Sequence, residues 1–161
     1  MIPNLLLLTG PDDYRLIERR NFYRSAFRKK FEDGEVEVYD ETHSFGDLEN
    51  AVMTPNLFGS KRLIFVENFW DADKFEKAEK SDFFTRLPEM SEQCTVMVIQ
   101  GNLDKRLKFS KFLLKNAKVE EFKSMEEGEL IEWMVRFAGK EIESGGGAES
   151  QSNPLNYAMA R

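Results

Sequence analysis

The chain has 161 residues, of which 41% are hydrophobic and 32% charged, with one cysteine, one histidine and a formal net charge of −6. This composition predicts one soluble globular domain and excludes a disulfide scaffold and a Cys/His zinc site. The run Leu5–Leu8 is too short to cross a bilayer, and Met1–Asn4 lack a basic secretory flank, so we expect a cytoplasmic protein without a membrane partner. The net charge argues against general nucleic-acid binding but allows a local basic face.

Five short apolar runs alternate with longer amphipathic segments, a pattern typical of parallel strands joined by helices. Leu5–Leu8, Leu63–Val66 and Val96–Ile99 are wholly apolar and predict central strands. Val36–Tyr39 and Val119–Phe122 include acidic residues and predict edge strands. The chain is therefore predicted to form an α/β three-layer sandwich around a mostly parallel five-stranded sheet.

The segments between these runs have helical periodicity. Asp12 and Asp13 can cap a helix that continues to Phe31, and Ser44 begins a shorter helix that Pro55 stops. Three further helices are expected over residues 74–87, 104–117 and 126–142.

The character of the chain changes after Glu143. Ser144–Gly147 form a flexible break, and residues 148–161 have no sustained apolar periodicity. We expect a folded domain over residues 1–143 and a flexible or truncated tail over residues 144–161.

The turn after the first predicted strand is where a P-loop would hold a nucleotide phosphate against a helix N-terminus. The turn has one glycine, Gly10, and no lysine. Pro11 lacks a backbone N–H donor, and the carboxylates of Asp12 and Asp13 would repel a phosphate. Residues Gly10 to Asp13 therefore predict a degenerate P-loop, and we expect no cofactor.

Two alternatives stay open at this point. Asp12 and Asp13 could bind magnesium in a phosphoacceptor receiver domain, although the acceptor position offers Glu67 or Asn68 in place of an aspartate. A divergent nucleotide-binding enzyme is the second alternative. His43 lies in a polar stretch without a nucleophile motif, so no catalytic residue and no metal ligand is assigned.

The segment Thr54–Arg62 is unusual for a turn because it carries two large apolar residues, Leu57 and Phe58, among turn-forming residues. If both side chains face outward, their burial in a partner would contribute about 3 to 6 kcal/mol, which is the scale of a binding hot spot. If they fold back onto the sheet, they fill the loop. The residues alone leave both interpretations open.

Three motifs recur together in one known family. They are Leu6–Asp13 (LLLTGPDD), Asn56–Leu63 (NLFGSKRL) and Asn102–Arg106 (NLDKR), with a weaker match at Glu132–Met134. In order and spacing they resemble the delta subunit of the bacterial DNA polymerase III clamp loader, from residue 3 to about residue 143. The resemblance implies an AAA+-like fold of the P-loop NTPase type that lacks a functional P-loop.

The resemblance also implies a function in DNA replication without intrinsic enzyme activity, as a subunit of a DNA polymerase holoenzyme. Leu57 and Phe58 correspond to the wedge that enters a pocket on the sliding clamp (beta subunit) and helps to open it, while Asn56 and Met53 add contacts. Other implied partners are the ATPase (gamma/tau) and delta-prime subunits, with DNA bound indirectly or weakly. The family's lid and collar domains have no counterpart in residues 144–161.

The first predicted helix is strongly basic, with seven Lys and Arg residues between Arg15 and Lys30 against the single acid Glu18. This is either a solvated helix face or a surface that meets DNA phosphates or an acidic partner. The candidate residues are Arg15, Arg19, Arg20, Arg24 and Arg28.

Overall fold

The computed structural model describes residues 1–55 and 59–143, with side chains described as far as residue 136. The chain divides into two compact units. The first is Met1–Phe122 and the second begins at Lys123. Each unit is described by itself below.

A five-stranded sheet forms the centre of the first unit, and all its neighbouring strands are parallel. The strand order is β2-β3-β4-β1-β5. The strands are β1 (Leu5–Thr9), β2 (Glu35–Tyr39), β3 (Arg62–Glu67), β4 (Cys94–Gln100) and β5 (Lys118–Glu121). The three apolar runs are the central strands and the two runs with acidic residues are the edges, as predicted.

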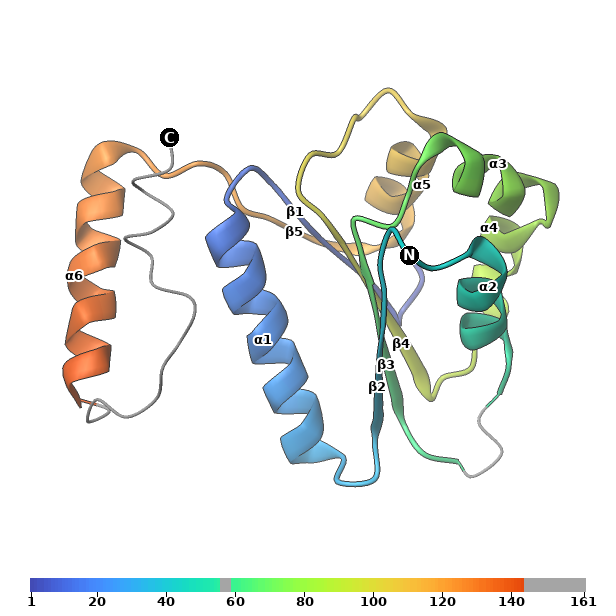
Figure 1. Cartoon of the computed structure of the whole chain (residues 1–161), viewed down its shortest axis with the longest axis horizontal. Coiled ribbons are helices and arrows are strands. Elements are labelled where there is room, and N and C mark those ends of the chain that lie inside the picture. The colour runs from blue at the N-terminus through green and yellow to red at the C-terminus, as the bar shows by residue number, and fades with distance from the viewer. Residues whose placement is uncertain (56–58, 144–161) are drawn as a thin grey trace. The chain divides into compact units, whose positions relative to one another are not determined.

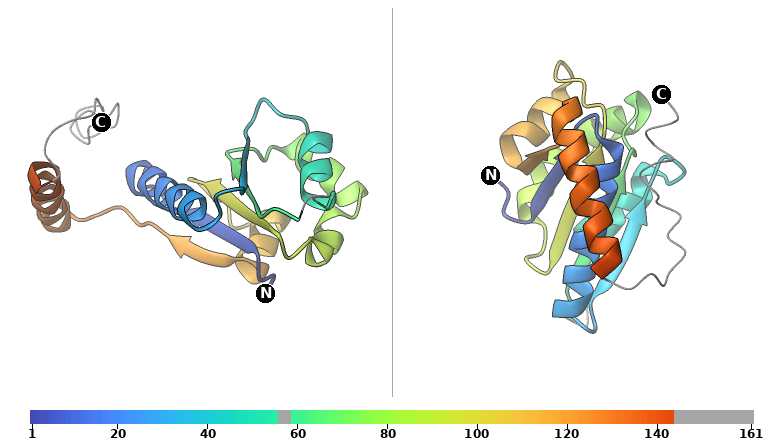
Figure 2. Two further views of the ribbon diagram at one scale, coloured as in Figure 1. Left: turned by 90° about the horizontal axis from the view of Figure 1, so that it is seen from below. Right: turned by 90° about the vertical axis from the view of Figure 1, so that its left-hand side faces the viewer.

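Helices cover both faces of this sheet (Figures 1 and 2). Leu16 of α1 (Asp13–Lys30) packs on one face with Phe65 and Met97. The other face buries a larger cluster that includes Leu48 and Phe109. Its covering elements are α2 (Phe45–Met53), α3 (Ala72–Lys80), α4 (Phe83–Arg86), the 3-10 helix η1 (Leu87–Glu89) and α5 (Lys108–Asn116). The predicted three-layer α/β sandwich is confirmed.

The helix predicted over residues 74–87 is divided in the structure. α3 ends at Lys80, and Asp82 adopts a left-handed backbone conformation with φ of 56° before α4 begins. A left-handed residue cannot continue a right-handed helix. After this break the ring of Phe83 is buried, where it packs edge-on against Phe45 with ring centroids 5.4 Å apart.

The helix predicted over residues 104–117 starts later, at Lys108. Asp104 accepts a hydrogen bond from the backbone N–H of Arg106 (3.0 Å), and its carbonyl accepts one from Leu107 (3.1 Å). These bonds form a turn in place of a first helical turn.

The second unit contains α6 (Glu127–Glu143), which the apolar periodicity predicts over residues 126–142. The carbonyl of Glu126 accepts a hydrogen bond from the N–H of Leu130 (2.9 Å), while the Glu129 carboxylate accepts one from the N–H of Glu126 (3.2 Å). The domain boundary at residue 143 stays a prediction, because residues 144–161 lie outside the described residues. Within the described ranges, no helix has the length and apolar character needed to cross a membrane.

Candidate functional site

The turn between β1 and α1 is three residues long, Gly10 to Asp12. The N–H of Gly10 donates to the carbonyl of Gly101 (3.0 Å), and the N–H of Phe122 donates to that of Thr9 (2.7 Å). Gly10 has a φ of 131°, and a Cβ built on it would lie 2.0 Å from the carbonyl oxygen of Phe122. Main chain therefore fills the space around this turn, and three residues are too few for the eight-residue P-loop motif.

The acidic residues Asp12 and Asp13 stabilise the N-terminus of α1. Asp12 is the N-cap, and its carboxylate accepts hydrogen bonds from the backbone N–H (3.0 Å) and the Nε (2.7 Å) of Arg15. Asp13 lies in the first turn, where a negative charge stabilises the helix dipole. No group of three or more His, Cys, Asp or Glu side chains suited to a metal ion occurs among the residues that the structure describes.

The receiver-domain alternative is wrong because the strand order differs. Receiver domains have the flavodoxin-like order 2-1-3-4-5, whereas here β1 lies between β4 and β5. At the expected acceptor position, Glu67 ends β3 and forms an ion pair of 2.7 Å with Arg20.

The basic face of α1 is partly neutralised by carboxylates from distant strands. Arg19 donates from Nε (2.6 Å) and Nη2 (3.2 Å) to Glu120 on β5. Hydrogen bonding to Glu120 raises the pKa of Arg19, and the same interaction lowers the pKa of Glu120. Of the five candidate arginines, Arg19 and Arg20 pair with carboxylates on strands, and Arg15 pairs with Asp12 at the start of its own helix. The prediction that this face meets DNA or an acidic partner therefore depends chiefly on Arg24 and Arg28.

The second candidate site is the loop of residues 54–61. It leads into the amino end of β3, whereas the β1–α1 turn follows the carboxyl end of β1, so the two sites lie at opposite ends of the parallel strands. Asn56, Leu57 and Phe58 are outside the described residues, and their role stays a prediction. Both ends of the loop are fixed. The N–H of Thr54 donates to Asn50 (3.0 Å), and the carbonyl of Lys61 accepts from Glu35 (2.9 Å).

Arg62 joins the two ends of this loop. Its Nη1 donates to the carbonyls of Ala51 (2.8 Å) and Thr54 (3.1 Å), two groups at the C-terminal end of α2. Its Nε and Nη2 donate to Oε1 of Glu37 on β2 (3.1 and 2.6 Å). Burial alone would lower the pKa of Arg62, but the hydrogen bond and charge of Glu37 raise it overall. The guanidinium thus satisfies carbonyls that a helix end leaves unpaired.

Sequence reasoning missed Arg62. The available signal was an arginine directly before the apolar run Leu63–Val66, where a charge needs a partner. Met53, predicted to contact the clamp, is the last residue of α2 and is half-buried against the larger core cluster. Part of its side chain is therefore committed to packing.

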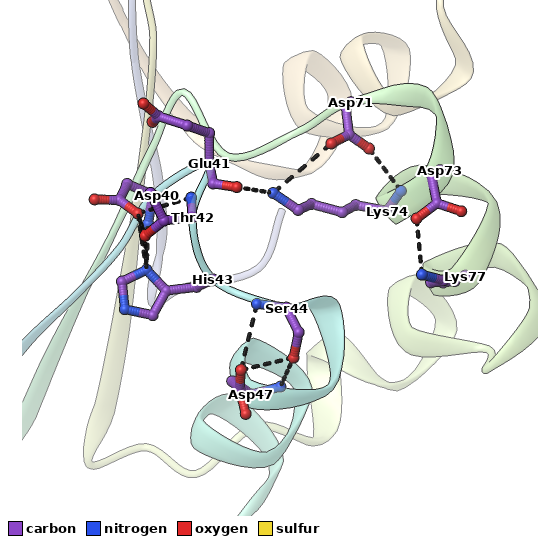
Figure 3. A network of polar contacts seen from close by, with 10 residues as sticks. All are labelled: Asp40, Glu41, Thr42, His43, Ser44, Asp47, Asp71, Asp73, Lys74 and Lys77. Carbon is purple, nitrogen blue, oxygen red and sulfur yellow. Dashed lines mark hydrogen bonds and ion pairs between the residues drawn. The ribbon is translucent and has the colours of Figure 1, made fainter.

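The start of α2 is held by a polar network (Figure 3). Ser44 and Asp47 form a reciprocal capping box. The Nζ of Lys74, on α3, donates to the carbonyl of Glu41 (2.7 Å) and lies 3.7 Å from the Asp71 carboxylate. Since α2 leads directly into the loop of residues 54–61, this network and Arg62 together fix the helix that carries the loop.

The comparisons with known proteins agree with this fold. Residues 6–123 match the family described as DNA polymerase III, delta subunit. The chain belongs to this family. The matched range includes the β1–α1 turn, the loop of residues 54–61 and all five strands except the first residue of β1. No curated protein matches the chain significantly.

Among solved structures, the chain is similar to the DNA clamp loader delta protein (YqeN) of Bacillus subtilis. The two share 23% sequence identity with a TM-score of 0.63, over 87% of this chain and 44% of that protein. The chain thus spans less than half the length of the delta protein that it matches, and the likeness concerns the fold.

Proposed function

We propose that this chain acts in DNA replication as the clamp-binding domain of a clamp-loader delta subunit. In this proposal Leu57 and Phe58 enter a hydrophobic pocket on the sliding clamp, and Asn56 and Met53 contact the clamp beside it. A ligand that binds the open ring more tightly than the closed ring shifts the ring toward opening by that difference in affinity. The chain needs no catalytic step of its own.

The proposed setting is the cytoplasm, within a DNA polymerase III holoenzyme. Family membership supports this setting. The proposed partners beside the clamp are the ATPase (gamma/tau) and delta-prime subunits, which would supply the ATP hydrolysis and its timing. Contact with DNA is indirect or weak in this proposal.

The observation that carries the proposal is that hydrogen bonds hold both ends of the loop of residues 54–61 in place. We call these bonds the loop frame. Arg62 bonds α2 on one side of the loop and β2 on the other, and its side chain is only 11% exposed. A loop whose ends are already ordered loses less conformational entropy when it binds. Two apolar side chains at its centre can therefore contribute most of their burial free energy to affinity.

Titration against the sliding clamp of the same organism tests the proposal. The Leu57→Ala/Phe58→Ala variant is expected to bind at least about 100-fold more weakly, because two apolar side chains contribute about 3 kcal/mol or more when buried. Isothermal titration calorimetry with the wild-type chain and the variant measures the difference.

A matched control is Phe22→Ala, which removes an exposed aromatic side chain from α1, on the sheet face opposite to α2. Its clamp affinity should equal that of the wild type. The proposal fails if the wild-type chain does not bind the clamp, or if the Leu57→Ala/Phe58→Ala variant binds as tightly as the wild type.

A further inference from the structure

The outward side of α5 carries two adjacent stripes of different chemistry. The helix packs on the core through Phe109, Ser110 and Leu113, which are all at most 5% exposed. Phe112 and Asn116 flank these residues and are half-buried, and at 100° per residue the other positions lie on the outward arc. Leu107 and Leu114 form one stripe there, and Lys108, Lys111 and Lys115 form the next; all five are exposed. We call these five residues the α5 outer face.

The apolar stripe begins at a position where leucine is unfavourable. Leu107 is the N-cap of α5, it is 56% exposed, and its side chain cannot accept a capping hydrogen bond. Ser, Thr, Asp and Asn are preferred at this position because their side chains bond the free N–H groups of the first turn. Leu114 lies two turns later on the same side of the helix and is 37% exposed. The protein thus places a leucine where a polar residue would make the helix more stable.

The basic stripe differs from the basic face of α1. There, Arg15, Arg19 and Arg20 pair with carboxylates. On α5, Lys108 lies 3.2 Å from Glu79 in an exposed pair, and no carboxylate in the described part of the chain pairs with Lys111 or Lys115. Their ammonium groups are available to an anionic partner.

We infer that the α5 outer face is a docking surface for an acidic amphipathic segment of a partner protein, one that carries carboxylates beside apolar side chains. A nucleic-acid backbone would satisfy the lysines but leave Leu107 and Leu114 in contact with charge and water. A segment with both chemistries buries the leucine stripe and pairs with the lysine stripe. An apolar contact centre with a polar rim is typical of protein–protein interfaces.

This surface is separate from the proposed clamp site. Leu107 follows the carboxyl end of β4, whereas the loop of residues 54–61 precedes the amino end of β3. α5 runs back from the carboxyl end of β4 to the amino end of β5 and packs beside β1, whereas the loop leads into β3, which is separated from β1 by β4. The two surfaces therefore have no residue in common, and the inference does not depend on clamp binding.

Fluorescence anisotropy with the whole chain tests the inference. The probe is a labelled synthetic helix-forming peptide with Asp and Glu on one face and Leu on the other, alongside a peptide in which Ser replaces each Leu and a single-stranded oligonucleotide of equal charge. Wild-type protein is expected to bind the Leu-containing peptide at least about 10-fold more tightly than the other two probes.

The Leu107→Asn variant separates binding from folding. Asn at an N-cap stabilises a helix, so the melting temperature should rise by about 3 °C. Affinity for the Leu-containing peptide should nevertheless fall at least about 5-fold. The Lys111→Gln/Lys115→Gln variant should lower that affinity in dilute salt and have less effect at high ionic strength. Arg28→Gln/Lys29→Gln on α1 is the matched control and should bind like the wild type.

Three results would overturn the inference. They are an unchanged affinity in Leu107→Asn, equal binding of the Leu and Ser peptides, and tighter binding of the oligonucleotide that only the lysine variant abolishes. The last result would assign the face to nucleic acid. Clamp titration of the same variants should match the wild type, so a failure here is distinguishable from a failure of the proposed clamp function.

Discussion

At the scale of single residues, Arg62 connects the elements on both sides of the proposed clamp site. It bonds two carbonyls of α2 and one carboxylate of β2. Arg62→Ala would remove this donor from the two carbonyls and leave the Glu37 carboxylate with the Tyr39 hydroxyl as a donor, so we expect a loss of about 2 to 4 kcal/mol in the free energy of unfolding. Urea denaturation followed by circular dichroism measures it. Lys61→Ala is the neighbouring control, since the Nζ of Lys61 makes a single long bond of 3.4 Å to the Glu92 carbonyl within the described residues, and it should change stability by less than about 0.5 kcal/mol.

Arg62→Ala should also weaken clamp binding if the loop frame matters. Arg62→Lys keeps the charge but cannot bond three acceptors in two directions. We expect its stability and clamp affinity to fall between those of the wild type and Arg62→Ala. Full clamp affinity in Arg62→Ala at a temperature where the protein is folded would contradict a role for the frame.

Glu120 gives the molecule an acid-sensitive contact. Its pKa is lowered from 4.5, first by the hydrogen bond from Arg19 and also by the one from Tyr23. A lowered pKa in the folded state adds stability above pH 4.5, and this contribution is lost as the pH falls through the folded-state value. We therefore expect Glu120→Gln to show a smaller decrease in stability below pH 4.5 than the wild type.

Urea midpoints measured from pH 7 to pH 3 test this expectation. Glu18→Gln serves as a control, because Glu18 is an exposed carboxylate on α1, the helix that carries Arg19. The control should keep the wild-type pH profile. Identical profiles for Glu120→Gln and the wild type would show that the contact does not respond to acid.

At the scale of elements, the turn from β1 to α1 is closed by main chain from two other segments. Gly10→Ala would place a methyl group 2.0 Å from the carbonyl oxygen of Phe122 in a backbone region that favours glycine. We expect a loss of more than about 2 kcal/mol, or failure to fold. Gly46→Ala in α2 is the control. There the new methyl group meets only Ser44 Oγ at 3.8 Å, and stability should be unchanged or rise slightly in thermal melts.

Local sequence signals predicted the elements that local interactions determine. Asp12 and Ser44 begin helices because their own side chains cap the next turn. The break at Asp82 was not predictable, because nothing in its sequence neighbourhood requires a left-handed residue; packing of the following phenylalanines sets it. The same limit applies to Arg19 and Arg62, whose partners come from other strands. The composition of the loop of residues 54–61 indicated a candidate site. The hydrogen bonds that Arg62 makes across the two ends of this loop could not be predicted from composition.

At the scale of the whole molecule, the net charge of −6 hides an uneven distribution. Ion pairs neutralise the first part of α1, and Arg28, Lys29 and Lys30 stay exposed at its end. Any DNA affinity of α1 should therefore depend on Arg24 and Arg28, fall steeply with salt, and decrease on charge reversal at both positions. Anisotropy with duplex DNA at several salt concentrations measures this. Binding that is independent of salt would contradict a DNA-facing role.

The closed turn at Gly10 has a consequence for how this unit can be controlled. Where related folds leave room for a phosphate, β1 and Phe122 are joined directly through backbone hydrogen bonding. The turn between β1 and α1 therefore has no space for a phosphate that could come and go during a reaction cycle. If the proposed clamp binding is timed, we expect the timing to come from a change elsewhere, such as the covering and uncovering of the loop of residues 54–61 by another subunit.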